Sequence, residues 1–221
     1  LIMELRWHHD IVRPYRWHFF IFLVGFMITK PKGCHDIYGT EAKKWQYVNE
    51  VINNVEGCCA DRCYAPWPDL GSAIKENKIP LFSLGLKKPL KEFDMVGFSL
   101  QYEMSYTTIL YMLDLAEIPL LSKDRGENYP IIQAGGPCAC NPEPLADFVD
   151  IFVIGDGEIS MRQLAELKLK VKDKKEFLTL ASQIEGVYVP SITKPVYENG
   201  KIVKFEGNSV KRAICLDLET A

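Results

Sequence analysis

Three short apolar runs in the middle of the chain carry the strongest hydrophobic pattern, and each ends in a polar or glycine-rich turn. They span residues 94–103, 130–144 and 149–158. Apolar runs of this length, bounded by turns, are typical of buried parallel strands in α/β folds. Because ligands of such folds bind outside the carboxyl ends of the strands, we expect a binding site at these three turns.

Helical periodicity fills the segments between and after these runs. Residues 105–116 place apolar side chains at helical spacing, and Pro119 ends this helix. Residues 159–175 predict an amphipathic helix, and a shorter helix is expected over 175–183. The alternation of strands and helices predicts an α/β fold.

The segments that flank this central region are less regular. Residues 40–52 predict a helix that Thr40 caps, and residues 70–77 predict a short helix that Asp69 caps. Residues 79–84 predict a short strand. Near the end of the chain, Asn199-Gly200 supplies the positive backbone angles of a tight turn and predicts a β-hairpin.

Composition narrows the classes of function. The 221 residues include 26 basic and 29 acidic side chains, so the net charge of −3 gives no bulk attraction to nucleic acid. The apolar run over residues 19–28 is too short to cross a bilayer as a helix. We therefore expect a cytoplasmic protein with no membrane span and no strong nucleic-acid signal.

The seven cysteines match no disulfide scaffold, because their number is odd and their spacing irregular. The pairs Cys59/Cys63 and Cys138/Cys140 could suggest a metal, but no C-x-x-x-C-x-x-C run for an iron–sulfur cluster occurs. We expect mostly reduced thiols and no metal site.

Two of the three turns carry glycines that could serve a ligand. A turn such as Gly135-Gly136 has no Cβ atoms, so its backbone can approach a phosphate or amide group closely. In the turn 155–158, Gly157 permits a sharp bend, and Asp156 and Glu158 suit the positive end of the following helix. The alternative without a ligand is a tight crossover for Gly135-Gly136 and helix capping for the turn 155–158.

Residues 59–221 resemble the N-terminal, cobalamin-binding-like domain of an uncharacterised group of radical SAM proteins. The runs that carry the resemblance are residues 65–69, 79–84, 96–103, 112–116, 134–138, 141–147 and 154–158. The resemblance implies a flavodoxin-like (Rossmann-like) doubly wound parallel sheet, followed by a C-terminal hairpin. It divides the chain into an atypical extension over residues 1–58, an α/β domain over 59–190, and a hairpin and linker over 191–221.

The resemblance also implies a cofactor site, with cobalamin or another nucleotide-tailed ligand as its occupant. In cobalamin domains a serine-containing turn and a Gly-Gly turn line the nucleotide tail. The implied side-chain partners are Ser99, Gln101 and Glu103. The implied backbone contacts come from Gly135, Gly136, Gly155 and Gly157, and no catalytic residue is assigned.

The sequence differs from this family in two respects, and both argue against a catalytic role for these residues alone. The strand, helix and histidine-bearing turn that begin the family are replaced here. The barrel that holds the 4Fe-4S cluster and S-adenosylmethionine would follow the linker, and its three-cysteine motif does not occur among the 221 residues. We therefore expect a truncated accessory domain whose partner is a radical SAM catalytic domain, normally in cis.

Two alternatives stay open at this point. One is a non-catalytic interaction or scaffold domain whose glycine turns serve only the fold. The other rests on residues 30–54, which resemble the N-terminal part of histidyl-tRNA synthetase. No class II synthetase motif follows this stretch, so the resemblance implies at most a synthetase-like fragment.

Overall fold

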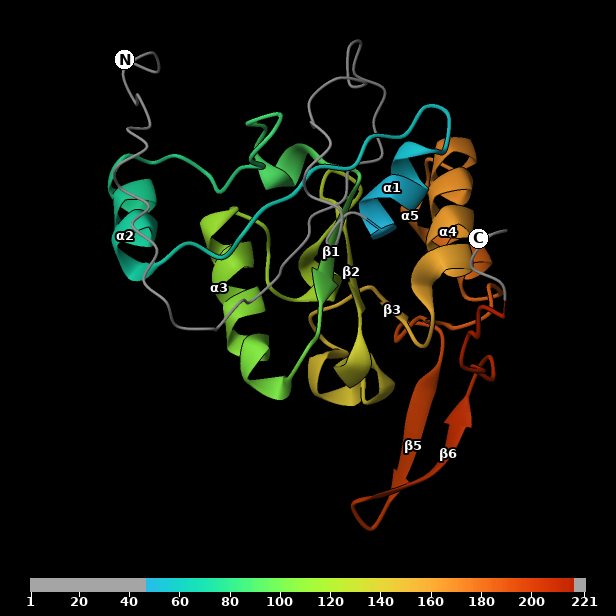
Figure 1. Ribbon diagram of the computed structural model, residues 1–221. Coiled ribbons are helices and arrows are strands. Elements are labelled where there is room, and N and C mark those ends of the chain that lie inside the picture. The colour runs from blue at the N-terminus through green and yellow to red at the C-terminus, as the bar shows by residue number, and fades with distance from the viewer. Residues whose placement is uncertain (1–46, 217–221) are drawn as a thin grey trace.

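A four-stranded sheet forms the centre of the protein (Figure 1). The computed structural model describes residues 47–216, and the strands follow one another in the order β1-β2-β3-β4. The strands β1 (Met95–Ser99), β2 (Ile131–Gly135) and β3 (Ile151–Val153) are parallel, and β4 (Val187–Tyr188) pairs antiparallel to β3. The three parallel strands coincide with the three predicted apolar runs.

Each strand is buried on both faces, which explains why the runs are continuously apolar. Successive side chains point to opposite sides of a strand, so neighbouring residues belong to different cores. Val96 and Ile132 pack on one face with helices α2 (Pro68–Glu76) and α3 (Tyr106–Leu115).

On the other face, Met95 and Ile131 pack with helices α1 (Tyr47–Asn53), α4 (Gly157–Lys170) and α5 (Lys174–Ala181). Helices therefore cover the sheet on both sides, and the predicted flavodoxin-like α/β fold is confirmed. The parallel arrangement holds for β1, β2 and β3, and β4 adds one antiparallel strand at the edge of the sheet.

The helix predicted over residues 159–175 ends earlier, at Lys170. Val171 has an extended backbone, and the Asp173 carboxylate accepts a hydrogen bond from Glu176 N at 2.7 Å, which caps α5. The shorter helix predicted next is therefore confirmed as α5, and a new N-cap separates the two.

Two predictions near the start of the described region are wrong in detail. Helix α2 begins at Pro68, and Asp69 lies in its first turn instead of capping it, because proline is pre-organised for the first helical position. The strand predicted over residues 79–84 is reduced to one bridge, between Phe82 and Pro89. The predicted cap Thr40 lies outside the described residues.

The predicted C-terminal hairpin is confirmed as β5 (Lys194–Glu198) and β6 (Lys201–Glu206). Asn199 and Gly200 have φ angles of 51° and 75°, as a two-residue turn of this kind requires. The hairpin projects from the body of the protein on the side to which the parallel strands β1, β2 and β3 point (Figure 1).

Single 3-10 turns complete the connections. They are η2 (Leu90–Glu92), η3 (Glu103–Ser105), η4 (Ser122–Asp124), η5 (Pro137–Cys140) and η6 (Glu143–Leu145). Among the helices of residues 47–216, none has the length and apolar character needed to cross a membrane. The apolar run over residues 19–28 lies outside the described part of the chain.

Candidate functional site at the carboxyl edge of the sheet

The pairing of β1 with β2 brings the first two predicted turns together. Ser99 lies opposite Gly135 in the parallel register. Beyond the strands, Leu100 N donates to Gly135 O at 2.6 Å, and Cys138 N donates to Leu100 O at 3.0 Å. The loops that follow β1 and β2 therefore lie side by side at the carboxyl edge of the sheet.

The space beside Gly136 is filled by this neighbouring loop. Gly136 has a φ of +102°, which side chains rarely adopt. A Cβ atom at this position would lie 3.0 Å from Leu100 O and 3.1 Å from Leu100 N. The close approach that Gly136 permits here is therefore that of the Leu100 backbone, which belongs to the same chain.

The third turn is filled in the same way, by residues 212–215, which we call the strap. Gly155 forms a parallel bridge with Ala213, and Ala213 N donates to Ile154 O at 3.0 Å. Asp156 N donates to Ala213 O, also at 3.0 Å. A Cβ atom on Gly155 would lie 2.2 Å from Ala213 O, so the strap passes where a ligand was expected.

Asp156 also holds the strap, which corrects its expected role as a cap. It occupies the N-cap position of α4, but its side chain makes no capping hydrogen bond there. Its Oδ2 atom accepts a hydrogen bond from Cys215 N at 2.9 Å. Gly157 is the first residue of α4, and a Cβ atom there would meet only Met161 Cγ, at 3.5 Å.

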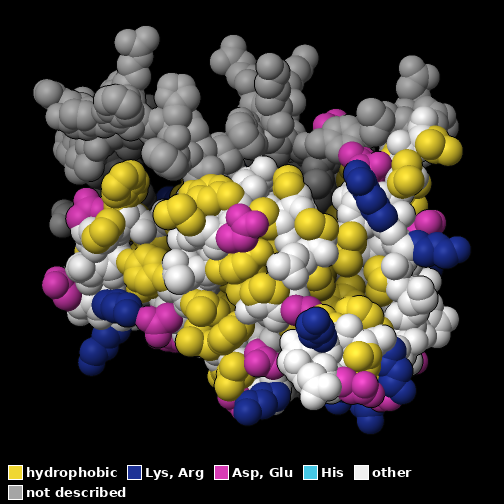
Figure 2. Space-filling view, turned by 90° about the horizontal axis from the view of Figure 1, so that it is seen from below, with side chains coloured by type: hydrophobic (Ala, Val, Ile, Leu, Met, Phe, Trp, Pro, Cys, Tyr) yellow, Lys and Arg dark blue, Asp and Glu magenta, His cyan; other side chains and the backbone are white. Residues whose placement is uncertain are grey.

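The predicted side-chain partners stand at the rim of this edge. Gln101 Nε2 donates to Ser99 Oγ at 2.8 Å, and both Gln101 and Glu103 are exposed. Met104 beside them is 82% exposed. Figure 2, which views the molecule from the carboxyl side, shows hydrophobic side chains across the centre of this face, interrupted by isolated acidic groups.

The environment of the Cys138 thiol at this edge disfavours its ionised form. Partial burial raises the pKa of Cys138, and the nearby Glu103 carboxylate raises it further. Burial likewise raises the pKa of Tyr106, to which Cys138, Glu103 and Cys140 contribute. A thiol whose pKa is raised carries little thiolate and is a weak nucleophile. Within residues 47–216, no group of three or more His, Cys, Asp or Glu residues could hold a metal ion.

A groove of about 530 Å³ lies away from the first two turns, between α4, α5 and the strap. Its walls include Ser160, Leu167, Leu180 and Ile214. Asp156 of the third turn also lines it, so the groove reaches the third predicted turn but not the turns that follow β1 and β2.

A family model described as radical SAM proteins, N-terminal, matches residues 45–190, which is more than half of the 221-residue chain. The chain belongs to this N-terminal family of radical SAM proteins. No curated protein and no solved structure matches it. The membership confirms the resemblance to a radical SAM N-terminal domain that the sequence motifs indicated.

As a radical SAM N-terminal region, the chain is an accessory domain, and its family implies a catalytic domain in cis. The family likewise implies a 4Fe-4S cluster and S-adenosylmethionine in that catalytic domain. The division at residues 58 and 190, the cobalamin site and the synthetase-like stretch stay predictions.

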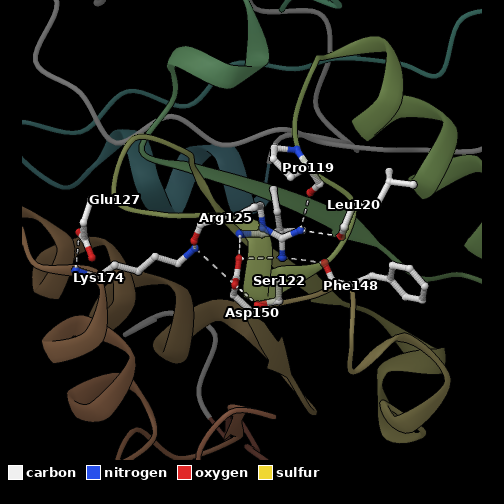
Figure 3. A network of polar contacts seen from close by, with 9 residues as sticks. Pro119, Leu120, Ser122, Arg125, Glu127, Phe148, Asp150 and Lys174 are labelled. Atoms are coloured by element: carbon white, nitrogen blue, oxygen red, sulfur yellow. Dashed lines mark hydrogen bonds and ion pairs between the residues drawn. The ribbon is translucent and has the colours of Figure 1, made fainter.

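Sequence reasoning missed a buried ionic network on the opposite, amino edge of the sheet (Figure 3). Asp150 precedes β3, and its Oδ2 atom accepts hydrogen bonds from Ile132 N at 2.7 Å and Arg125 Nη2 at 3.1 Å. Lys174 Nζ lies 3.5 Å from Asp150 Oδ1, and Ser122 Oγ donates to the same oxygen. One carboxylate thus joins a loop, a strand and a helix.

The two cations of this network are largely shielded from water. Arg125 also donates to the carbonyl oxygens of Pro119, Leu120 and Phe148, at 2.9, 2.7 and 2.8 Å. Burial lowers the pKa of Lys174 and of Arg125, and Asp150 opposes both shifts. The sequence signal for this network was Asp150, a charged residue inside an apolar run. A charge that is buried is nearly always paired, so Asp150 indicated a buried partner of opposite charge.

Proposed function

We propose that this chain is a non-catalytic accessory domain that serves the radical SAM catalytic domain in cis through protein contact. The observation that carries the proposal is the filling of two glycine turns by the chain's own backbone, at Gly136 by Leu100 and at Gly155 by Ala213. Glycines that close the fold in this way leave no room at these points for a nucleotide tail.

The chemistry of the edge agrees with a contact role. In enzymes that use a cofactor, the cofactor carries the difficult chemistry and the protein supplies binding and orientation. The described residues offer no metal-holding group, and the exposed edge combines Met104 with the polar groups of Gln101 and Glu103. A mixed surface of this kind suits contact between domains of one chain.

Cobalamin, or another nucleotide-tailed ligand, is the second candidate, and one observation favours it. Ser99 and Gly135 meet at the carboxyl edge, where ligands of such folds bind. A Cβ atom on Gly135 would lie 3.7 Å from Val153 O, an ordinary contact distance, so this glycine is not closed off. A ligand here would rely on Ser99, Gln101, Glu103, Gly135 and Gly157.

Titration with hydroxocobalamin, read by visible absorbance and equilibrium dialysis, separates the two candidates. We expect no saturable binding to the purified chain, with circular dichroism confirming that it is folded. Gly135→Val is the test variant. Gly126→Val is the matched control, because no atom lies within 4 Å of a Cβ there. Saturable binding that Gly135→Val abolishes and Gly126→Val retains would refute the contact role in favour of cobalamin.

A further inference from the structure

The hairpin β5–β6 has two faces of opposite character. Residues directly opposite each other in an antiparallel pair lie on the same face. The register therefore places Pro195 with Phe205 and Tyr197 with Ile202 on one face. The other face carries the pairs Lys194–Glu206, Val196–Lys204 and Glu198–Lys201. One side of this ribbon is apolar, and the other is charged.

A β-bulge decides which β6 residue occupies this face opposite Tyr197. The register shifts between Val196 and Tyr197, whose partners are Lys204 and Ile202, so Val203 is the extra residue on β6. Without the bulge, Val203 would lie opposite Tyr197, and Ile202 would turn to the charged face. The irregularity thus keeps Ile202 on the apolar face.

This apolar face is exposed to solvent. The exposed fractions of Tyr197, Phe205 and Ile202 are 56%, 54% and 42%, and that of the bulge residue Val203 is 50%. A two-stranded ribbon gains little stability by itself, since no second layer covers its apolar side. Contiguous exposed apolar groups on a folded protein mark interaction surfaces.

The base of the hairpin is held firmly to the body. The buried Thr193 donates from Oγ1 to Asn208 O at 3.3 Å, and Asn208 Nδ2 donates to Ser182 Oγ at 2.9 Å. The Tyr188 hydroxyl donates to Glu143 Oε1 at 2.5 Å and lies 3.2 Å from Thr193 O. Because Glu143 belongs to η6, in the connection that follows β2, the hairpin base is joined to the carboxyl-edge loops.

We infer that the apolar face, Pro195, Tyr197, Ile202 and Phe205, packs against an apolar surface of the radical SAM catalytic domain in cis. The inference rests on the proposed function and names its surface. The family match ends at residue 190, and the hairpin follows directly. The strap then returns the chain to Gly155, so the hairpin stands between two anchored points and continues the carboxyl edge (Figure 1).

The size of the face argues against a second copy of this chain as the occupant. A stable interface between proteins buries about 800 Å² on each partner. Four side chains of a two-stranded ribbon fall short of that area. A domain tethered in the same chain needs less contact, because the linker makes its effective concentration high.

Limited tryptic cleavage at Lys201 and Lys204, within β6, tests the inference in the protein that carries its catalytic domain. We expect cleavage there to be at least about tenfold slower than in the 221-residue chain, because docking reduces the population of the open form. Combining Tyr197→Ser with Phe205→Ser should restore fast cleavage. The matched control on the charged face, Val196→Ser with Glu198→Ser, should retain the protection.

Equal cleavage rates in the two-domain protein and the 221-residue chain would overturn the inference. Protection that rises with protein concentration would overturn it too, in favour of self-association. Cleavage at Lys211 or Arg212 distinguishes a failure of the hairpin inference alone from a failure of the proposed contact role. If the hairpin is unprotected but the two cleaved halves still co-migrate in size-exclusion chromatography, only the hairpin inference is lost. If the halves separate, the contact role is lost as well.

Discussion

The two edges of one sheet are closed by different means. At the amino edge, Asp150 gathers Arg125 and Lys174 into a buried network of side chains. At the carboxyl edge, backbone lies against glycine, as Leu100 does at Gly136 and Ala213 at Gly155. The first arrangement buries charge and excludes water. The second leaves polar and apolar side chains exposed at the rim.

This difference indicates that the amino edge serves the stability of the fold, whereas the carboxyl edge connects to the segment that follows the hairpin. The contacts of the ionic network join elements within the domain, so it stabilises the fold. The carboxyl edge includes the strap, which lies between the hairpin and the point where the described chain ends. A domain joined to this chain through the strap is therefore coupled to the third turn directly.

The largest effect is expected from Asp150→Ala, at the amino edge. Removal of one partner leaves Arg125 and Lys174 buried without their counter-charge, which costs about 3–5 kcal/mol of unfolding free energy. Urea denaturation monitored by circular dichroism measures the change. Asp147→Ala, at an exposed carboxylate in the same connection, is the control and should change stability little. A similar loss in both variants would contradict the assigned role of the network.

A smaller effect is expected from Gly155→Ala, at the carboxyl edge. The new Cβ atom would meet Ala213 O at 2.2 Å, and the φ of +102° is unfavourable for alanine. A strained backbone of this kind costs about 1–3 kcal/mol, and the strap must shift as well. Gly157→Ala, two residues later, adds a Cβ atom that makes only an ordinary contact with Met161 Cγ at 3.5 Å, and it should keep or slightly raise stability in urea denaturation. Equal stability of the two variants would mean that the strap does not press on Gly155.

The smallest effect concerns Asp94, which precedes β1 at the amino edge. Its Oδ2 atom is buried without a hydrogen-bond partner among residues 47–216, and burial raises the pKa of this carboxyl above its ordinary 3.8. Between 3.8 and the raised pKa, the folded state binds more protons than the unfolded state, so stability falls as pH rises. Asp94→Asn should remove this fall in urea midpoints measured from pH 3 to 7, and Asp147→Asn should not.

The regular elements were accessible from the sequence because local patterns determine them. Apolar runs of strand length predicted β1, β2 and β3, and Asn199-Gly200 predicted the hairpin. The partners of Asp150 in the ionic network were not accessible, because Asp150 meets Arg125 across 25 residues, and nothing local to either residue specifies the pairing.

The meaning of the glycine turns was inaccessible for another reason. A glycine that admits a ligand and a glycine that admits the protein's own backbone look identical in sequence, since both lack a Cβ atom. Gly155 is filled by Ala213, and Asp156 bonds Cys215 across 59 residues. Only the structure reveals that the strap returns to this turn.

Residue-resolved hydrogen exchange of the Ala213 and Cys215 amides tests most directly whether the strap closes the carboxyl edge. These amides donate to Ile154 O and Asp156 Oδ2. We expect both to exchange at least about a hundredfold more slowly than the Gly200 amide in the hairpin turn, because hydrogen-bonded amides exchange only after opening. Exchange of both amides as fast as that of Gly200 would show that the strap is not in place, and would contradict the account.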